Sequence, residues 1–138
     1  MRKLPAILLV DDDDTTNYLN QLLFHRLEVT EQLLVALNGQ QALAVLQSCQ
    51  PTGPVPFPSL ILLDMKMPVM DGFDFLEAYT LLPDEQQNAV IIMLTTSLNL
   101  LDVERVQDLP IAGFLTKPLT KEKIYDVLHT HFGHPLPN

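Results

Sequence analysis

The chain has 138 residues, of which 47% are apolar, and its 8 Lys and Arg against 17 Asp and Glu give a formal net charge of −9. This length and apolar content predict one folded domain and exclude a disordered chain or a cramped two-domain enzyme. The acidic charge, without any basic cluster, excludes direct nucleic-acid binding through phosphate contacts.

Five short apolar runs are typical of buried β-strands. They span Ala6–Val10, Gln32–Leu37, Ser59–Leu63, Ala89–Leu94 and Gly113–Thr116. Because they are apolar along most of their length, they indicate a parallel sheet that is covered on both faces. Even the longest uninterrupted apolar run, Ala89–Leu94, is far shorter than the ~20 residues that cross a bilayer. We therefore expect no membrane insertion.

Stretches with helical spacing follow these strands. The expected apolar stripes are Leu19, Leu22, Leu23 and Leu27 in the first helix, Ala42, Leu46 and Cys49 in the second, and Ile124, Val127, Leu128 and Phe132 in the fifth. The third helix is expected over Phe73–Leu82 and stops at Pro83. A short fourth helix is expected to run to about Asp108. The expected caps of the last two helices are Asn99 with Asp102, and Thr120.

The alternation of strands and helices predicts an α/β fold with right-handed crossovers. We expect a doubly wound, flavodoxin-like, five-stranded parallel sheet with helices on both faces and strand order 2-1-3-4-5. This domain is assigned to residues 1–132, and residues 133–138 to a short C-terminal tail. The segment Gln50–Pro58 contains four prolines and is expected to be a loop insertion. We favour a semi-rigid surface insertion over a docking segment for a partner.

Two features bear on the cellular compartment. Arg2 and Lys3 precede an apolar stretch, as in a signal peptide, but Asp11–Asp14 replaces the cleavage region. The single Cys49 has no partner for a disulfide or a CxxC motif, which fits a reducing compartment. We therefore expect a cytoplasmic protein. The four histidines have no metal-ligand spacing and are interpreted as surface residues: His25, His129, His131 and His134.

Chemically active side chains gather where the predicted strands end. Asp11 and Asp12 follow the first strand, Asp64 the third, Thr95 the fourth and Lys117 the fifth. Ligands of open parallel sheets bind at this edge. Two carboxylates ~5 Å apart repel by roughly 3 kcal/mol at an effective dielectric near 20, so three of them favour a divalent cation. Their oxygen ligands favour Mg²⁺, and together with the lysine they predict a phosphoryl-transfer site.

Four motifs at these strand ends resemble the receiver domains of two-component response regulators, of the chemotaxis-regulator type. They are ILLVDD at residues 7–12, LILLDMKMPVMDG at 60–72, MLTTS at 93–97 and GFLTKP at 113–118. Each motif alone is a weak signal, but the four occur in the same order and each lies at a strand end. The resemblance covers nearly the whole chain.

The resemblance implies a role for each matched residue. Asp64 is the expected phosphoacceptor, which forms an acyl phosphate by attack on a phosphohistidine. Mg²⁺ is the expected cofactor, bound by Asp11, Asp12, Asp64 and the backbone carbonyl of Lys66. The side chain of Lys66 is also expected to lie over the site.

The remaining matched residues imply binding and readout of the phosphoryl group. Thr95 is expected to hydrogen-bond this group, and Lys117 to bridge it to the acceptor, held by a cis peptide to Pro118. Phe114 is expected to act with Thr95 as a switch that alters a surface around the fourth helix. Structural support of the acceptor turn is expected from Met67, Pro68, Asp71 and Gly72.

These features predict a stand-alone receiver in a phosphorelay. Its expected partners are a sensor histidine kinase or histidine phosphotransfer protein, which donates the phosphoryl group, and a downstream protein target. It is expected to promote its own phosphorylation and slow dephosphorylation, but not to be an enzyme in the usual sense. No output domain is expected after the fifth helix.

Two alternatives remain. Asp11–Thr15 fits the DxDxT pattern of haloacid-dehalogenase-like phosphatases, with Asp11 as nucleophile and Asp13 as general acid. This class leaves LLDMKMPVMDG unexplained, and no acidic pair follows Lys117 to complete its magnesium site. The other alternative is a degenerate receiver that only binds partners. We favour a capping role for Asp13 and Asp14, since acids stabilise the start of a helix.

Overall fold

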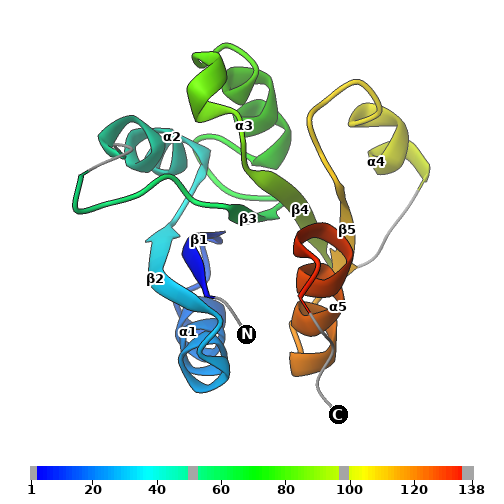
Figure 1. Ribbon diagram of the computed structural model, residues 1–138. Helices are drawn as coiled ribbons and strands as arrows, with labels where there is room; N and C mark the ends of the chain where they lie inside the picture. Colours follow the sequence, from blue (N-terminus) through cyan, green and yellow to red (C-terminus); the bar gives the residue numbers. More distant parts are fainter. Residues whose placement is uncertain (1–2, 50–52, 97–99, 135–138) are drawn as a thin grey trace.

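Strands and helices alternate along the chain in the computed structural model, which describes residues 3–49, 53–96 and 100–134 (Figure 1). In chain order the elements are β1 (Leu4–Val10), α1 (Asp14–Leu27), β2 (Thr30–Ala36), α2 (Gly39–Ser48), β3 (Leu60–Asp64), α3 (Gly72–Tyr79), the 3-10 turn η1 (Asp84–Gln86), β4 (Val90–Thr95), α4 (Leu100–Arg105), β5 (Gly113–Thr116) and α5 (Lys121–Phe132). All adjacent strands are parallel, and their order is β2-β1-β3-β4-β5. The predicted fold class and strand order are confirmed.

Each face of the sheet carries its own apolar core. Leu8 and Val10 of β1 pack with residues of α2 and α3 on one face. Ile7 and Leu9 point to the other face and pack with residues of α1 and α5. Figure 1 shows the same division, with α1 and α5 on one side of the strands and α2, α3 and α4 on the other. Because successive side chains of a strand alternate between faces, one apolar run supplies both cores.

The helix starts follow the capping residues in the sequence. Asp13 caps α1 by accepting the backbone N–H of Thr16, and Asp14 is the acid of the first turn. Thr120 caps α5 by accepting the N–H of Lys123. The predicted caps Asp13 and Thr120 are therefore confirmed, whereas Asn99 lies outside the described residues.

The predicted apolar stripe of the first helix is wrong in part. Leu19 and Leu22 are exposed, at 57% and 44%, while Asn17 and Asn20 are buried. The periodicity of leucines fails here because α1 turns two amides toward the protein interior near the carboxyl edge of the sheet. The stripes of α2 and α5 are confirmed at Ala42, Leu46, Ile124, Val127 and Leu128.

Two helices are shorter than expected. Beyond α3, the N–H groups of Leu81 and Leu82 bond three residues back, to Ala78 and Tyr79, so the chain tightens before Pro83. Beyond α4, Val106 and Leu109 bond three residues back in the same way, so no α-helix continues to Asp108. Such tight last turns are common where a helix ends.

The proline-rich segment has neither helix nor strand over its described residues, 53–58. It contacts the edge strand through Gln32, whose side-chain amide donates to the carbonyl of Pro54 at 2.7 Å. Pro58 is buried, and the peptide between Lys117 and Pro118, at the far side of the sheet, is cis as predicted. Among the described helices, none has the length and apolar character to cross a membrane.

Candidate functional site

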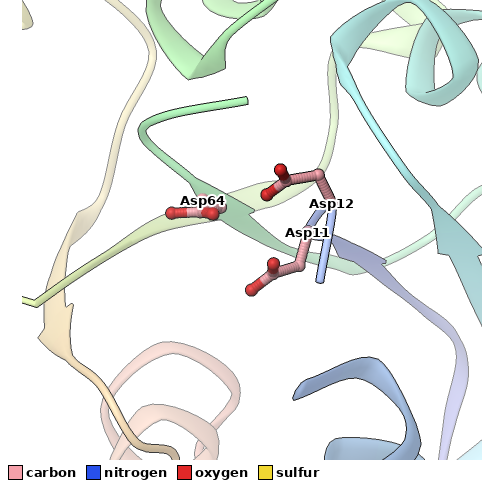
Figure 2. Close-up of side chains that lie close together, drawn as sticks. All are labelled: Asp11, Asp12 and Asp64. Carbon is pink, nitrogen blue, oxygen red and sulfur yellow. The ribbon is translucent and has the colours of Figure 1, made fainter. Parts of the chain in front are cut away.

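Three carboxylates meet at the carboxyl edge of the central strands. Asp11 and Asp12 directly follow β1, and Asp64 is the last residue of β3. The register pairs Val10 with Leu63, which places the two strand ends side by side. One carboxylate oxygen from each side chain lies within 4.8 Å of the others (Figure 2). The predicted acidic cluster is therefore present in the structure.

Asp11 is held by three neighbours. Its Oδ2 accepts a hydrogen bond from Lys117 Nζ at 2.7 Å, and its Oδ1 accepts the N–H of Asp13 at 3.0 Å. Its backbone carbonyl accepts from Asn17 Nδ2 at 2.8 Å. Asp11 is buried, whereas Asp12 is exposed. The two neighbouring acids thus have different environments, one fixed and the other open to solvent.

Lys117 connects two of the acids. Its Nζ lies 2.7 Å from Asp11 Oδ2 and 3.3 Å from Asp64 Oδ2. Burial disfavours the ammonium, but the hydrogen bond with Asp11 and the charges of Asp64 and Asp11 outweigh burial, so the pKa of Lys117 is raised. The lysine therefore stays charged between the two carboxylates.

Asp64 is the acid whose ionisation is disfavoured. Its burial raises its pKa, the Lys117 charge lowers it, and the Asp11 charge raises it again. A backbone hydrogen bond from Lys66 also lowers it, but the net direction is upward. The carboxylate is thus short of compensating positive charge, a deficit that a divalent cation would remove.

Thr95 and Phe114 lie on neighbouring strands beside this cluster. Thr95 is the buried last residue of β4, and its carbonyl accepts the N–H of Lys117 at 2.7 Å. Phe114 of β5 is opposite Met93 in register and packs, half-buried, on the face covered by α2 and α3. The side chain of Lys66 is exposed. A backbone hydrogen bond thus brings Thr95 close to Lys117, and Phe114 lies on β5, the strand next to that of Thr95.

A tight turn connects Asp64 to α3. Gly72 donates its N–H to the carbonyl of Met65, and a Cβ at this position would lie 2.6 Å from the carbonyl oxygen of Asp64. Only glycine allows this approach, and Asp71 caps the helix that follows. Val69, 77% exposed, has φ of 69°, a left-handed conformation that a β-branched residue rarely adopts. The turn is therefore closely packed at one end and strained at its tip.

Asn17 is a residue of the site that was not predicted from the sequence. This residue is 4% exposed, and it fixes the carbonyl that immediately precedes Asp12. Its Oδ1 is buried and has no hydrogen-bond partner among the residues that the structure describes. The signal available in the sequence was an amide six residues after Asp11, at a helix position that faces the sheet, but apolar periodicity assigned that face to leucines.

Asp13 does not have the environment of a general acid. It is exposed, its carboxylate accepts hydrogen bonds from the side chain and backbone of Thr16, and these bonds lower its pKa. A carboxyl that is ionised and engaged as a helix cap cannot donate a proton near neutral pH. This geometry disfavours the phosphatase alternative.

The sequence matches the family described as Response regulator receiver domain over residues 7–129. Response regulator Rcp1 of Synechocystis is 31% identical over 123 residues, which are 89% of this chain and 83% of that protein. A probable chemotaxis protein CheY of Rhizobium etli is 31% identical over 127 residues, 92% of each chain. The crystal structure of a two component response regulator from Cytophaga hutchinsonii superposes with a TM-score of 0.83, at 24% identity, over 96% of this chain and all of that one, which supports the fold.

Proposed function

Since the chain belongs to the response regulator receiver domain family, we propose that it accepts a phosphoryl group on Asp64 from a phosphohistidine. The donor is a sensor histidine kinase or a histidine phosphotransfer protein. The observation that carries the proposal is the position of Lys117 Nζ, 2.7 Å from Asp11 and 3.3 Å from Asp64, beside the open carboxylate of Asp12. A buried acid next to a cation and two further acids fits a phosphoacceptor better than a structural ion pair.

The donor atoms of the cluster fit Mg²⁺. Three carboxylates with no thiolate or imidazole among them are the hard oxygen ligands that this ion prefers. Asp11, Asp12 and Asp64 would hold it, together with the backbone carbonyl of Lys66. When bound, the ion neutralises charge on the acids and on phosphoryl oxygens.

The transfer step is an in-line displacement at phosphorus. A carboxylate oxygen of Asp64 forms the new P–O bond while the P–N bond to the donor imidazole breaks. The electron pair of that bond stays on the imidazole nitrogen. Lys117 binds a phosphoryl oxygen through its ammonium, and the hydroxyl of Thr95 donates to another. Asp64 thereby becomes an acyl phosphate.

The phosphorylated state is read out through Thr95 and Phe114. Movement of the Thr95 side chain toward the phosphoryl group vacates space beside β5, and the ring of Phe114 fills it. This changes the surface that α4, β5 and α5 present to a downstream protein. Support comes from the register, which puts Phe114 opposite Met93 and Thr116 opposite Thr95.

Phosphorylation by a small donor tests this function. Incubation with acetyl phosphate and Mg²⁺ is expected to add the mass of one phosphoryl group to the intact protein, and peptide mapping is expected to place it on Asp64. The Asp64→Asn variant is expected to show no gain, because its amide is not a nucleophile here. Asp74→Asn, which changes an exposed acid of α3, is the matched control and retains the gain. Undiminished labelling of Asp64→Asn would contradict the assignment of Asp64 as the phosphoacceptor.

A further inference from the structure

Lys123 is a cation in an unfavourable position. It is in the first turn of α5, where the helix dipole favours acids and disfavours positive charge. Its ammonium nevertheless has three acceptors: the carbonyl of Thr116 at 2.6 Å, the hydroxyl of Thr116 at 3.2 Å and the carbonyl of Pro118 at 3.0 Å. An ammonium has three donor hydrogens, so these contacts can engage all of them.

The two carbonyls lie on either side of Lys117. Thr116 ends β5 just before Lys117, and Pro118 follows it through the cis peptide. The N–H of Lys117 itself donates to Thr95 at 2.7 Å. The backbone around Lys117 is therefore fixed from β4 by one hydrogen bond and from α5 by Lys123.

Lys123 is in turn anchored at its own backbone. Its N–H donates to Oγ1 of Thr120, the cap of α5, at 3.2 Å. Lys121, two residues earlier in the same turn, is exposed and makes none of these contacts in the described part of the chain. Lys123 therefore has a defined position, whereas Lys121 is an ordinary solvated lysine.

We infer that Lys123 is a positioning residue for Lys117: it holds the β5–α5 loop so that the Lys117 ammonium reaches both Asp11 and Asp64. The inference rests on the proposed function, in which Lys117 binds the transferred phosphoryl group. Lys123 does not touch the reacting atoms. It acts by limiting the freedom of the backbone from which Lys117 extends, which matters because small displacements of a catalytic group slow a reaction steeply.

The test compares Lys123→Met with the matched control Lys121→Met and with Lys123→Arg, which keeps a charged donor. Lys123→Met is expected to lower the rate of phosphorylation by acetyl phosphate about tenfold at saturating Mg²⁺. Its affinity for Mg²⁺, measured by calorimetry without a phosphodonor, is expected to stay unchanged, because the metal ligands are on other loops. Lys121→Met is expected to keep the wild-type rate, and Lys123→Arg to retain more of it than Lys123→Met.

A second measurement reports on Lys117 without any phosphorylation. In the metal-free protein, the NMR signal of Lys117 Nζ is expected to shift in Lys123→Met and to stay in place in Lys121→Met. A purely structural role of Lys123 predicts lower stability in urea with an unshifted Lys117 signal and a wild-type rate, and that result overturns the inference. If Lys123→Met does not fold, the phosphorylation rate and the Lys117 signal are measured in Lys123→Arg instead. A rate below that of the wild type with a shifted Lys117 signal supports the inference, and wild-type values of both overturn it.

The two proposals can fail separately. If the wild type takes no phosphoryl group on Asp64, the proposed function is wrong, while the Lys117 signal still decides whether Lys123 positions this side chain. If the wild type is phosphorylated and both readouts of Lys123→Met match it, only the inference about Lys123 is wrong.

Discussion

The charged residues of the site lower the stability of the metal-free protein, because two buried acids share one lysine. Asp64 is buried next to the negative charge of Asp11, and the single ammonium of Lys117 serves both. The net effect is a raised pKa for Asp64, so the folded protein without metal disfavours its ionised form. Function at this position therefore costs folding free energy, as is common at sites that must bind charge.

Removing this charge is expected to stabilise the metal-free protein. Because the pKa of Asp64 is higher in the folded than in the unfolded chain, the folded state binds more protons between the two values, and stability falls as pH rises through that window. Asp64→Asn has no such fall and is expected to be more stable at neutral pH by roughly 1 kcal/mol. Urea denaturation at several pH values, with EDTA, measures this.

The control for this prediction is Asp74→Asn, which also replaces an acid by its amide, but at an exposed position of α3, and is not expected to give this gain in stability. Mg²⁺ is expected to stabilise the wild type more than Asp64→Asn, since the variant has lost one ligand. Equal stability and equal pH dependence of Asp64→Asn and the wild type without metal would contradict the prediction.

The turn between β3 and α3 positions Asp64 at the end of its strand. Gly72 lies against the carbonyl of Asp64, and Gly39 at the start of α2 donates its N–H to the carbonyl of Met70 at 2.8 Å. The turn is thus held from its own helix and from a neighbouring one. Two glycines are needed because both approaches leave no space for a Cβ.

Gly72→Ala is expected to destabilise the protein and to displace the acceptor. The added Cβ would lie 2.6 Å from the carbonyl oxygen of Asp64, so the backbone must shift, at a cost of about 1–3 kcal/mol. Gly113→Ala is the matched control, since within the described parts of the chain its Cβ would meet only Ile92, at an ordinary 3.7 Å. Urea denaturation and Mg²⁺ calorimetry measure the two effects. Wild-type stability of Gly72→Ala would show that the turn is not closely packed.

The sequence predicted the strands and their order well, and some of the helices less well. An apolar run such as Ala89–Leu94 reports burial on both faces, which only an inner strand of a parallel sheet requires. The leucine spacing in α1 predicted the wrong buried face, because Leu19 and Leu22 lie at the surface and Asn17 is buried. A polar side chain that serves the site breaks the rule that apolar residues face inward.

Some residues of the site could be predicted from the sequence and others could not. Strand ends are fixed by topology, so the meeting of Asp11, Asp12 and Asp64 could be predicted from the sequence alone. The contacts of Asn17 and Lys123 could not, because they depend on how a side chain crosses from a helix to a loop. The placement of Lys123 in a first turn was the one local sign, since acids are favoured there.

Across the whole fold, α4 differs from the other described α-helices in its burial. None of its six residues is buried, and Leu100 and Leu101 are 79% and 77% exposed. Arg105 at its end stacks on the ring of Phe73, 3.9 Å from the centroid, and Val106 just beyond is buried. A helix without a buried residue can change position at small cost, and Val103 and Glu104 of α4 line one pocket together with Phe114.

Phosphorylation is therefore expected to shift the population of a pre-existing arrangement of α4 and Phe114. Coupling energies of this kind are typically about 1–3 kcal/mol, so the change is partial and not all-or-none. NMR spectra with Mg²⁺ and beryllofluoride, a mimic of the phosphoryl group, are expected to show large changes at Thr95, in α4 and at Phe114. Phe114→Leu, which removes the ring but keeps an apolar side chain, is expected to keep the changes around Asp64 and to weaken those in α4. Changes confined to the surroundings of Asp64 in the wild type would mean that the site and α4 are not coupled, and the proposed readout through Thr95 and Phe114 would then be wrong.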